Sequence, residues 1–179
     1  MLLAVIALAL GSLAGPAQER AAPTPETVPP ALEGAIDQTY SEANTIVVKT
    51  RDGIAHLFHF TKRTAVHGVS KTDGALNGLT EGTRVVVHYT EDGTEKTAVE
   101  VDRIGKDGLR EMSGVVTDVD RGAKQLSLQL ADGSHETLEL SDRAAQSIGK
   151  DTAAATVIVY YTDEGGHKVA HYFRKIDPR

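Results

Sequence analysis

The feature that most constrains this chain of 179 residues is an internal duplication. Residues 34–64 align without a gap with residues 114–144, at an offset of 80. Residues 85–104 align with residues 157–176 at an offset of 72, and 8 of the 20 positions are identical. Since similar order, spacing and turn glycines recur, we predict two copies of one small domain. The first copy has eight more residues between its blocks, within residues 65–84.

Each copy shows the alternating pattern of about five β-strands. In the first copy we expect strands at residues 35–39, 45–50, 56–60, 84–89 and 97–104, with Asp-Gly turns closing the two hairpins. The last strand changes phase, so we predict a β-bulge near Val99 and Glu100. In the second copy we expect one helical turn at residues 141–147, capped by Ser141 or Asp142. The fold class is therefore all-β, with two tandem five-stranded OB-like or SH3-like barrels.

The N-terminal part has the composition of an export signal. An apolar run at residues 2–10 precedes small residues, so we predict a signal peptide at 1–17 with the mature chain beginning at Gln18 or, as the second choice, at Gly15. No Lys or Arg precedes the run, and an uncleaved anchor or a buried helix is the alternative. Without cysteine the chain cannot be a lipoprotein. We expect a proline-rich linker at 18–31, repeats at 32–106 and 111–179, and a periplasmic or secreted protein with no membrane span after cleavage.

The repeated pattern resembles small β-barrel domains of unknown function in exported bacterial proteins, which often occur in tandem. It combines Gly-x-Val, an Asp-Gly turn, Leu-x-x-Gly-x-x-Val-x-Val and Ala-x-x-Val, as at Gly114, at residues 79–87 and at residues 98–101. The resemblance implies the OB-like barrel fold over residues 32–176. It implies no catalytic residue.

Composition and motifs argue against most enzyme classes. The net charge of -6 and the absence of Trp disfavour a nucleic-acid partner. The seven histidines do not match between copies, and His56 and His59 should point to opposite faces of a strand. We therefore expect solvated or edge histidines, no metal site, no cofactor and no catalytic residue. The acidic pairs at the hairpin tips lack the ligand pattern of a calcium loop.

Two aromatic differences between the copies suggest a contact surface. Tyr160 and Tyr172 replace His88 and Glu100 of the first copy, and Phe173 follows them. We expect these three residues either to pack between the barrels or to form a partner surface beside them. The favoured function is a non-enzymatic binding or scaffold module of the bacterial cell envelope, whose partner is an unknown protein or envelope component. The alternative is a periplasmic protein that binds a small ligand or a metal ion.

Overall fold

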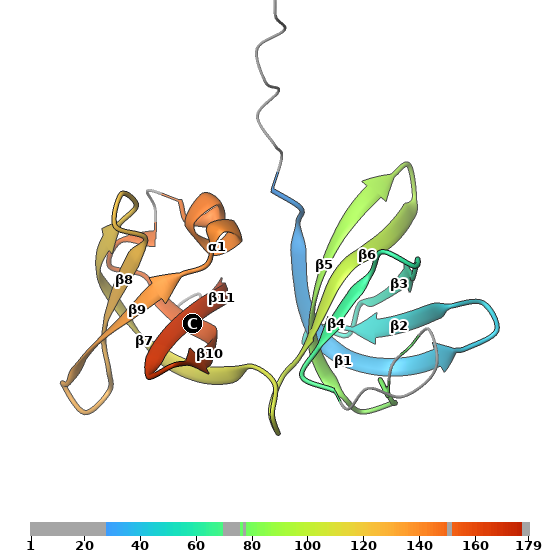
Figure 1. Cartoon of the computed structure of the whole chain (residues 1–179), viewed down its shortest axis with the longest axis horizontal. Helices are drawn as coiled ribbons and strands as arrows, with labels where there is room; N and C mark the ends of the chain where they lie inside the picture. The colour runs from blue at the N-terminus through green and yellow to red at the C-terminus, as the bar shows by residue number, and fades with distance from the viewer. Residues whose placement is uncertain (1–27, 70–75, 77, 150–151, 177–179) are drawn as a thin grey trace, which may run out of the picture.

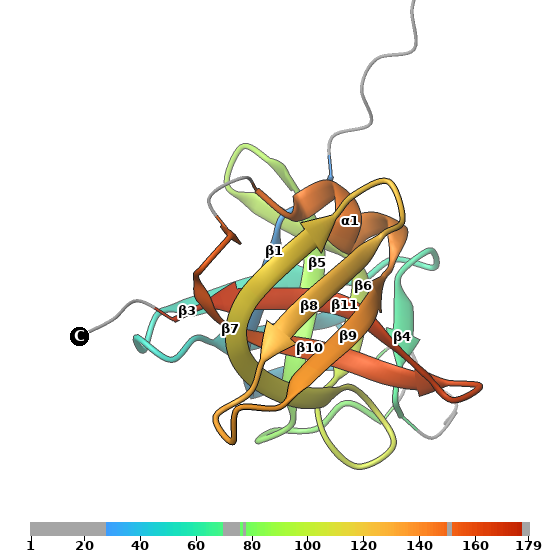
Figure 2. The same ribbon diagram turned by 90° about the vertical axis from the view of Figure 1, so that its left-hand side faces the viewer.

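The computed structural model describes residues 28–69, 76, 78–149 and 152–176, which form two β-barrels lying side by side (Figure 1). The segment that we predict to be the signal peptide, and most of the predicted linker, lie outside the described residues. No helix within the described ranges is long and apolar enough to cross a membrane. In Figure 2 the second barrel lies in front of the first.

The first barrel is a ring of five strands with a sixth added. Its strands are β1 (Ala31–Tyr40), β2 (Thr45–Lys49), β3 (Ala55–His59), β4 (Ala65–His67), β5 (Arg84–Asp92) and β6 (Glu95–Arg103). The sheet order is β3-β2-β1-β5-β6-β4, and a bridge between His59 of β3 and Thr97 of β6 closes the ring. The short strand β4 pairs in parallel with the second half of β6.

The second barrel repeats this order. Its elements are β7 (Arg110–Asp120), β8 (Gln125–Gln129), β9 (His135–Leu140), α1 (Asp142–Ser147), β10 (Thr156–Glu164) and β11 (His167–Lys175). The strands close as β10-β11-β9-β8-β7, with β9 and β11 parallel. A parallel contact between the third and fifth strands of a five-stranded barrel, with a helix after the third, is an OB-like arrangement.

The repeat predicted from the sequence accounts for these elements. Phe58 and Leu138 are fully buried at equivalent positions, and each barrel has its own hydrophobic core. Gly53 and Gly133 have φ of 87° and 83°, values that favour glycine in the hairpin turns. The Ser141 side chain caps α1 by accepting a hydrogen bond from the Ala144 backbone N–H at 3.2 Å. All-β character, duplication and the capped turn are thus confirmed.

The predicted bulge is also present, and in both barrels. His88 of β5 pairs with Glu100, but the next residue, Tyr89, pairs with Ala98, so Val99 is the extra residue of β6. In the second barrel the register skips His171 in the same way. A β-bulge redirects a side chain and sharpens the twist of its strand. The copies differ where the first has its additional residues, because β4 stands there in place of α1.

Candidate functional site

The two barrels meet along a seam with its own hydrophobic core. The residues that separate them are few, since β6 ends at Arg103 and β7 begins at Arg110. Tyr160 is completely buried at the centre of this core, which combines residues of both barrels: Val86, Ile104, Leu109 and Tyr160, with Ala31, Ile158 and Tyr172 partly buried around them. Tyr160 and Tyr172 stack with ring centroids 5.7 Å apart. The barrels therefore form one packed unit.

This arrangement places the three aromatic residues singled out from the sequence. Tyr160 and Tyr172 pack between the barrels, which is the first of the two positions expected for them. Phe173 packs instead against the hydrophobic core of its own barrel. Burial raises the pKa of Tyr160 above its ordinary value, and the negative charge of Glu33 adds to this. The Tyr160 side chain is thus a neutral component of the seam.

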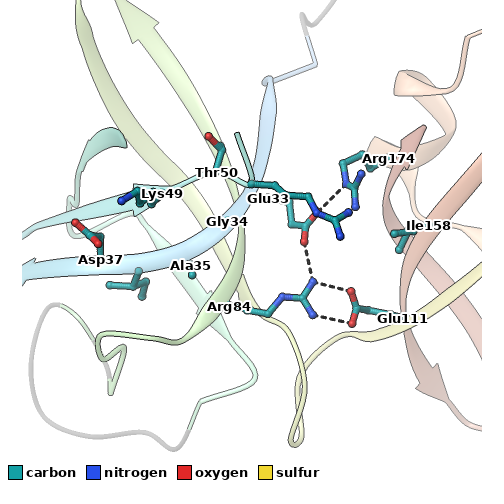
Figure 3. A pocket seen from close by; sticks show the side chains of 12 residues that line it. Glu33, Gly34, Ala35, Asp37, Lys49, Thr50, Arg84, Glu111, Ile158 and Arg174 are labelled. Carbon is teal, nitrogen blue, oxygen red and sulfur yellow. Dashed lines mark hydrogen bonds and ion pairs between the residues drawn. The ribbon is translucent and has the colours of Figure 1, made fainter. Parts of the chain in front are cut away.

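One side of the seam is held by a chain of ion pairs (Figure 3). Glu33 of β1 accepts hydrogen bonds from Arg84 at 2.7 Å and from Arg174 of β11 at 2.8 Å. Arg84 also donates two hydrogen bonds to Glu111 of β7, at 2.8 and 2.7 Å. Such two-pronged pairing of a guanidinium with a carboxylate fixes geometry as well as charge. This series of ion pairs joins the two barrels at two points, Glu33 with Arg174 and Arg84 with Glu111, beside a groove of about 550 Å³.

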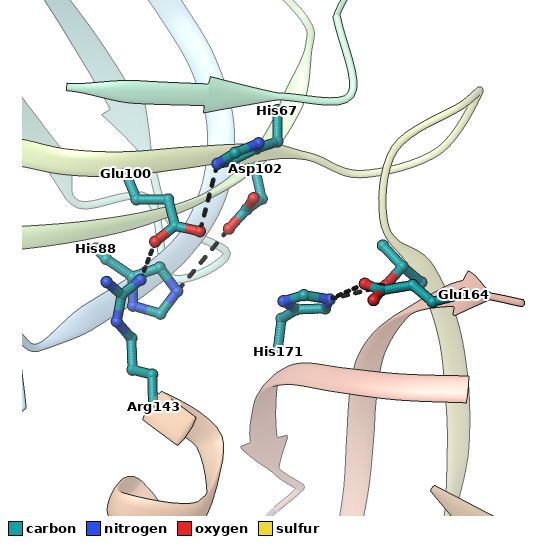
Figure 4. A network of polar contacts seen from close by, with 8 residues as sticks. His67, His88, Glu100, Asp102, Arg143, Glu164 and His171 are labelled. Atoms are coloured by element: carbon teal, nitrogen blue, oxygen red, sulfur yellow. Dashed lines mark hydrogen bonds and ion pairs between the residues drawn. The ribbon is translucent and has the colours of Figure 1, made fainter. Parts of the chain in front are cut away.

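The other side of the seam carries a cluster of histidines and carboxylates, shown in Figure 4. We call it the histidine cluster and define it by its members: His67, His88, Glu100, Asp102, Arg143, Glu164 and His171. The first four residues belong to the first barrel and the last three to the second. Arg143 of α1 pairs with Glu100 across the seam. Most of the cluster lines a cavity of about 260 Å³ between the barrels, while His88 and Arg143 line an adjoining one of about 200 Å³.

Burial dominates the electrostatics of this cluster. His88 and Asp102 are 3% and 4% exposed, and His88 Nε2 lies 3.9 Å from Asp102 Oδ2, too far for a hydrogen bond. Burial, together with the positive charge of Arg143, lowers the pKa of His88 to about 4. Burial, together with the charge of Glu100, raises the pKa of Asp102 to about 7. Removal from water thus favours the neutral form of both groups.

The surroundings of Glu100 and His171 shift the pKa values of these two members of the cluster. Burial would raise the pKa of Glu100, but the hydrogen bond from Arg143 and its positive charge lower it overall. Burial lowers the pKa of His171, whose Nε2 lies 2.8 Å from the Thr162 hydroxyl and 3.6 Å from Glu164. The cluster therefore combines the ionised carboxylate of Glu100 with the neutral imidazoles of His88 and His171 and with the buried carboxyl group of Asp102. Imidazole and carboxylate groups are donors that bind divalent cations.

The histidines only partly follow the sequence expectation. His56 lies 3.1 Å from the Lys96 ammonium, whereas His59 lies 3.3 Å from the Thr45 hydroxyl, so the close pair has two separate sets of neighbours. The expectation of solvated or edge histidines is wrong for His88, which β5 buries in the seam. Sequence reasoning also missed Glu100 and Asp102. Their alternation on one strand places both carboxylates on one face, and this was the signal available.

Comparisons with known proteins add a likeness in fold. No protein-family model matches the chain, and no curated protein matches it. Among solved structures, 31 chains match, one of them described as the crystal structure of Ag(I)CusF. That structure has a TM-score of 0.31 and 13% identity, and the match covers 42% of this chain and 99% of the other. The likeness is confined to part of the chain, and nothing about a ligand of this protein follows from it. The fold and the seam define the protein as a tandem OB-like barrel.

Proposed function

We infer that this protein is an exported, non-enzymatic binding module of the bacterial cell envelope, with the seam between its barrels as the binding region. The observation that carries the proposal is the complete burial of Tyr160 between the barrels. Because this side chain joins the two units, grooves lined by both barrels keep a fixed shape. A surface that is already organised loses little conformational entropy when it binds a partner.

The sequence supports the location and the non-enzymatic character. The apolar run at residues 2–10 and the proline-rich stretch after it are typical of an exported protein on a tether. The positions that the two repeats share are mainly core aliphatics and turn residues, which serve the fold. Two of the differences between the copies lie in the seam, where Tyr160 and Tyr172 face residues of the first barrel.

Export is tested with a reporter enzyme that is active only when its disulfides form outside the cytoplasm. Residues 1–31 fused to this reporter should give activity, and the same fusion without residues 2–17 should give none. N-terminal sequencing of the exported full chain should begin at Gln18. An inactive reporter, or a chain that retains Met1, would contradict export by a cleaved signal.

Binding through the seam is tested by site-specific photocrosslinking in the native host. A crosslinking residue replaces Arg51 or Lys106, which are exposed beside the grooves of the seam. Matched controls replace Leu57, 46% exposed on β3, and Glu139 on β9. The seam positions should give a discrete adduct that the control positions do not. Equal adducts at all four positions, or none at the seam, would overturn the proposal.

A further inference from the structure

The histidine cluster contains three side chains whose ligand atoms converge. The nitrogen of His67 and the carboxylate oxygens of Glu100 and Asp102 all lie within 4.8 Å of one another. The pairing of β4 with β6 produces this arrangement, because His67 is directly opposite Asp102 and Glu100 is two residues earlier on the same face. Tetrahedral ligands about 2.0–2.1 Å from a metal stand roughly 3.3 Å apart. The pair formed by His67 Nε2 and Glu100 Oε1, which are 3.7 Å apart, is already close to this spacing.

The burial of Asp102 is the second observation. Its side chain is only 6% exposed, and its Oδ2 accepts no hydrogen bond from any described residue. Burial of a carboxyl group is costly unless the group is neutral, paired with a charge or bound to a cation, and a bound cation would stabilise the ionised form of Asp102 here. Asp102 lines the 260 Å³ cavity, and so do His67 and Glu100. The unpartnered oxygen therefore belongs to the same space as the converging ligands.

The second barrel completes the surroundings of these ligands. His171 is the extra residue of the β11 bulge and lines the same cavity. Its two polar contacts, with Thr162 and Glu164, both use Nε2, which leaves Nδ1 available. A histidine that binds a metal through one nitrogen commonly has the other oriented by a carboxylate. In Figure 4 the ring of His171 lies between Glu164 and the three converging side chains.

We propose that the histidine cluster binds one divalent transition-metal cation, with His67, Glu100 and Asp102 as three ligands and His171 as the fourth. The inference rests on the proposed function in taking the seam as the binding region, and it names the ligand. Mixed imidazole and carboxylate donors suit Zn²⁺ and its neighbours in the first transition series, whereas Mg²⁺ and Ca²⁺ prefer sites made of oxygen alone. The site joins the barrels, because one ligand position belongs to the second barrel.

The test is calorimetric titration of the untagged full chain with ZnCl₂ at neutral pH, after removal of metal with a chelator. We expect one equivalent to bind. His67→Ala and Asp102→Asn should each weaken Zn²⁺ binding by more than about tenfold, since even partners of ligands contribute factors of about 10–100. His67 is largely exposed and Asn has the size of Asp, so both variants should fold, which circular dichroism melts verify.

The matched control is His167→Ala. His167 is also exposed and lies 3.3 Å from the single carboxylate of Glu139, without the second carboxylate that His67 has. Zn²⁺ binding should be unchanged in this variant. Absence of binding, equal binding by His67→Ala, or preferential binding of Ca²⁺ would overturn the metal site. If Zn²⁺ does not bind but crosslinking is selective at Arg51 and Lys106, the metal site is wrong and the proposed binding function stands. If neither Zn²⁺ binding nor selective crosslinking is found, both proposals are wrong.

Discussion

The ring of His88 lies edge-on to the ring of Tyr172 across the seam, with centroids 6.3 Å apart and planes at 87°. In the alignment of the repeats, Tyr160 occupies the position of His88, and Tyr172 occupies the position of Glu100. Each barrel therefore presents the same face to the other. After duplication the two faces diverged, so that the second barrel has aromatic side chains at positions where the first has His88 and Glu100.

We expect Tyr160→Ala to lower the free energy of unfolding by about 3–5 kcal/mol, the range for removal of a large aromatic side chain from a core. Tyr160 is fully buried in the seam, so its loss leaves a cavity between the barrels. Urea denaturation measures the change. Tyr40→Ala is the matched control, because Tyr40 is 47% exposed, and it should have little effect. Equal effects of the two substitutions would contradict a shared core.

The fold could largely be predicted because the duplication shows each sequence pattern twice, at aligned positions. Alternation, Asp-Gly turns and the phase slip at Val99 each occur in two aligned copies, and the structure has the strands and the bulge where they indicate. The strand β4 was not predicted. It has only three residues, Ala65–His67, and lies in the part of the first copy that has no counterpart, where alignment gives no help. Strands this short carry too little pattern to be recognised.

The candidate site was harder to predict because it depends on contacts between distant segments. Glu100 and Asp102 alternate along one strand, which is also the pattern of an ordinary solvated face. Only the pairing of β4 with β6 and the packing of the second barrel show that Asp102 is buried and close to His67. His171 faces the cavity because of a bulge whose side-chain direction the sequence pattern does not specify.

Gly34→Ala and Gly114→Ala should each destabilise the protein by about 1–3 kcal/mol, the usual effect of overpacking. A Cβ at Gly34 would lie 2.6 Å from the Lys49 carbonyl oxygen, and one at Gly114 would lie 2.8 Å from the Gln129 carbonyl oxygen. These equivalent glycines let the neighbouring strands approach closely. Gly122→Ala is the control, since its nearest neighbour would be 3.4 Å away. Equal melting temperatures for all three variants would contradict this account.

Glu33 should make stability depend on pH in the acidic range. Burial alone would raise the pKa of Glu33, but the Tyr160 hydroxyl and the guanidinium groups of Arg84 and Arg174 lower it below its ordinary value of 4.5. The pKa of Glu111 is also lowered, chiefly by its hydrogen bonds from Arg84. A carboxyl group whose pKa is lower in the folded state stabilises the protein above its ordinary pKa. That contribution is lost as the pH falls through the folded value.

We therefore expect Glu33→Gln to be less stable than the parent at pH 7, with the difference shrinking as the pH approaches 3. Unfolding in urea at each pH, with chelator present, measures it. The exposed Glu42→Gln is the control and should change the stability little. A difference that stays constant with pH would show that Glu33 acts through packing alone. A difference that grows toward low pH would contradict the assigned direction of the pKa shift.

The two barrels should be energetically coupled through the seam. Each has a small core of its own, and cores of this size contribute only about 3–5 kcal/mol of stability. Separation would expose the apolar seam, including Tyr160 and Val86, and would break the pair between Glu33 and Arg174. We expect fragments 32–108 and 111–179 each to melt below the intact chain. For domains of this length, about 1 kcal/mol corresponds to roughly 4–8 °C.

Mixing the fragments supplies the decisive measurement for this coupling. If the seam contributes binding energy, the two fragments should associate, and the melting temperature of the mixture should rise with their concentration, because association favours the folded state. Tyr160→Ala in the second fragment should abolish that rise, whereas Tyr40→Ala in the first should leave it. Fragments that each melt at the temperature of the intact chain, with no dependence on mixing, would show two barrels that are independent despite the contact between His88 and Tyr172.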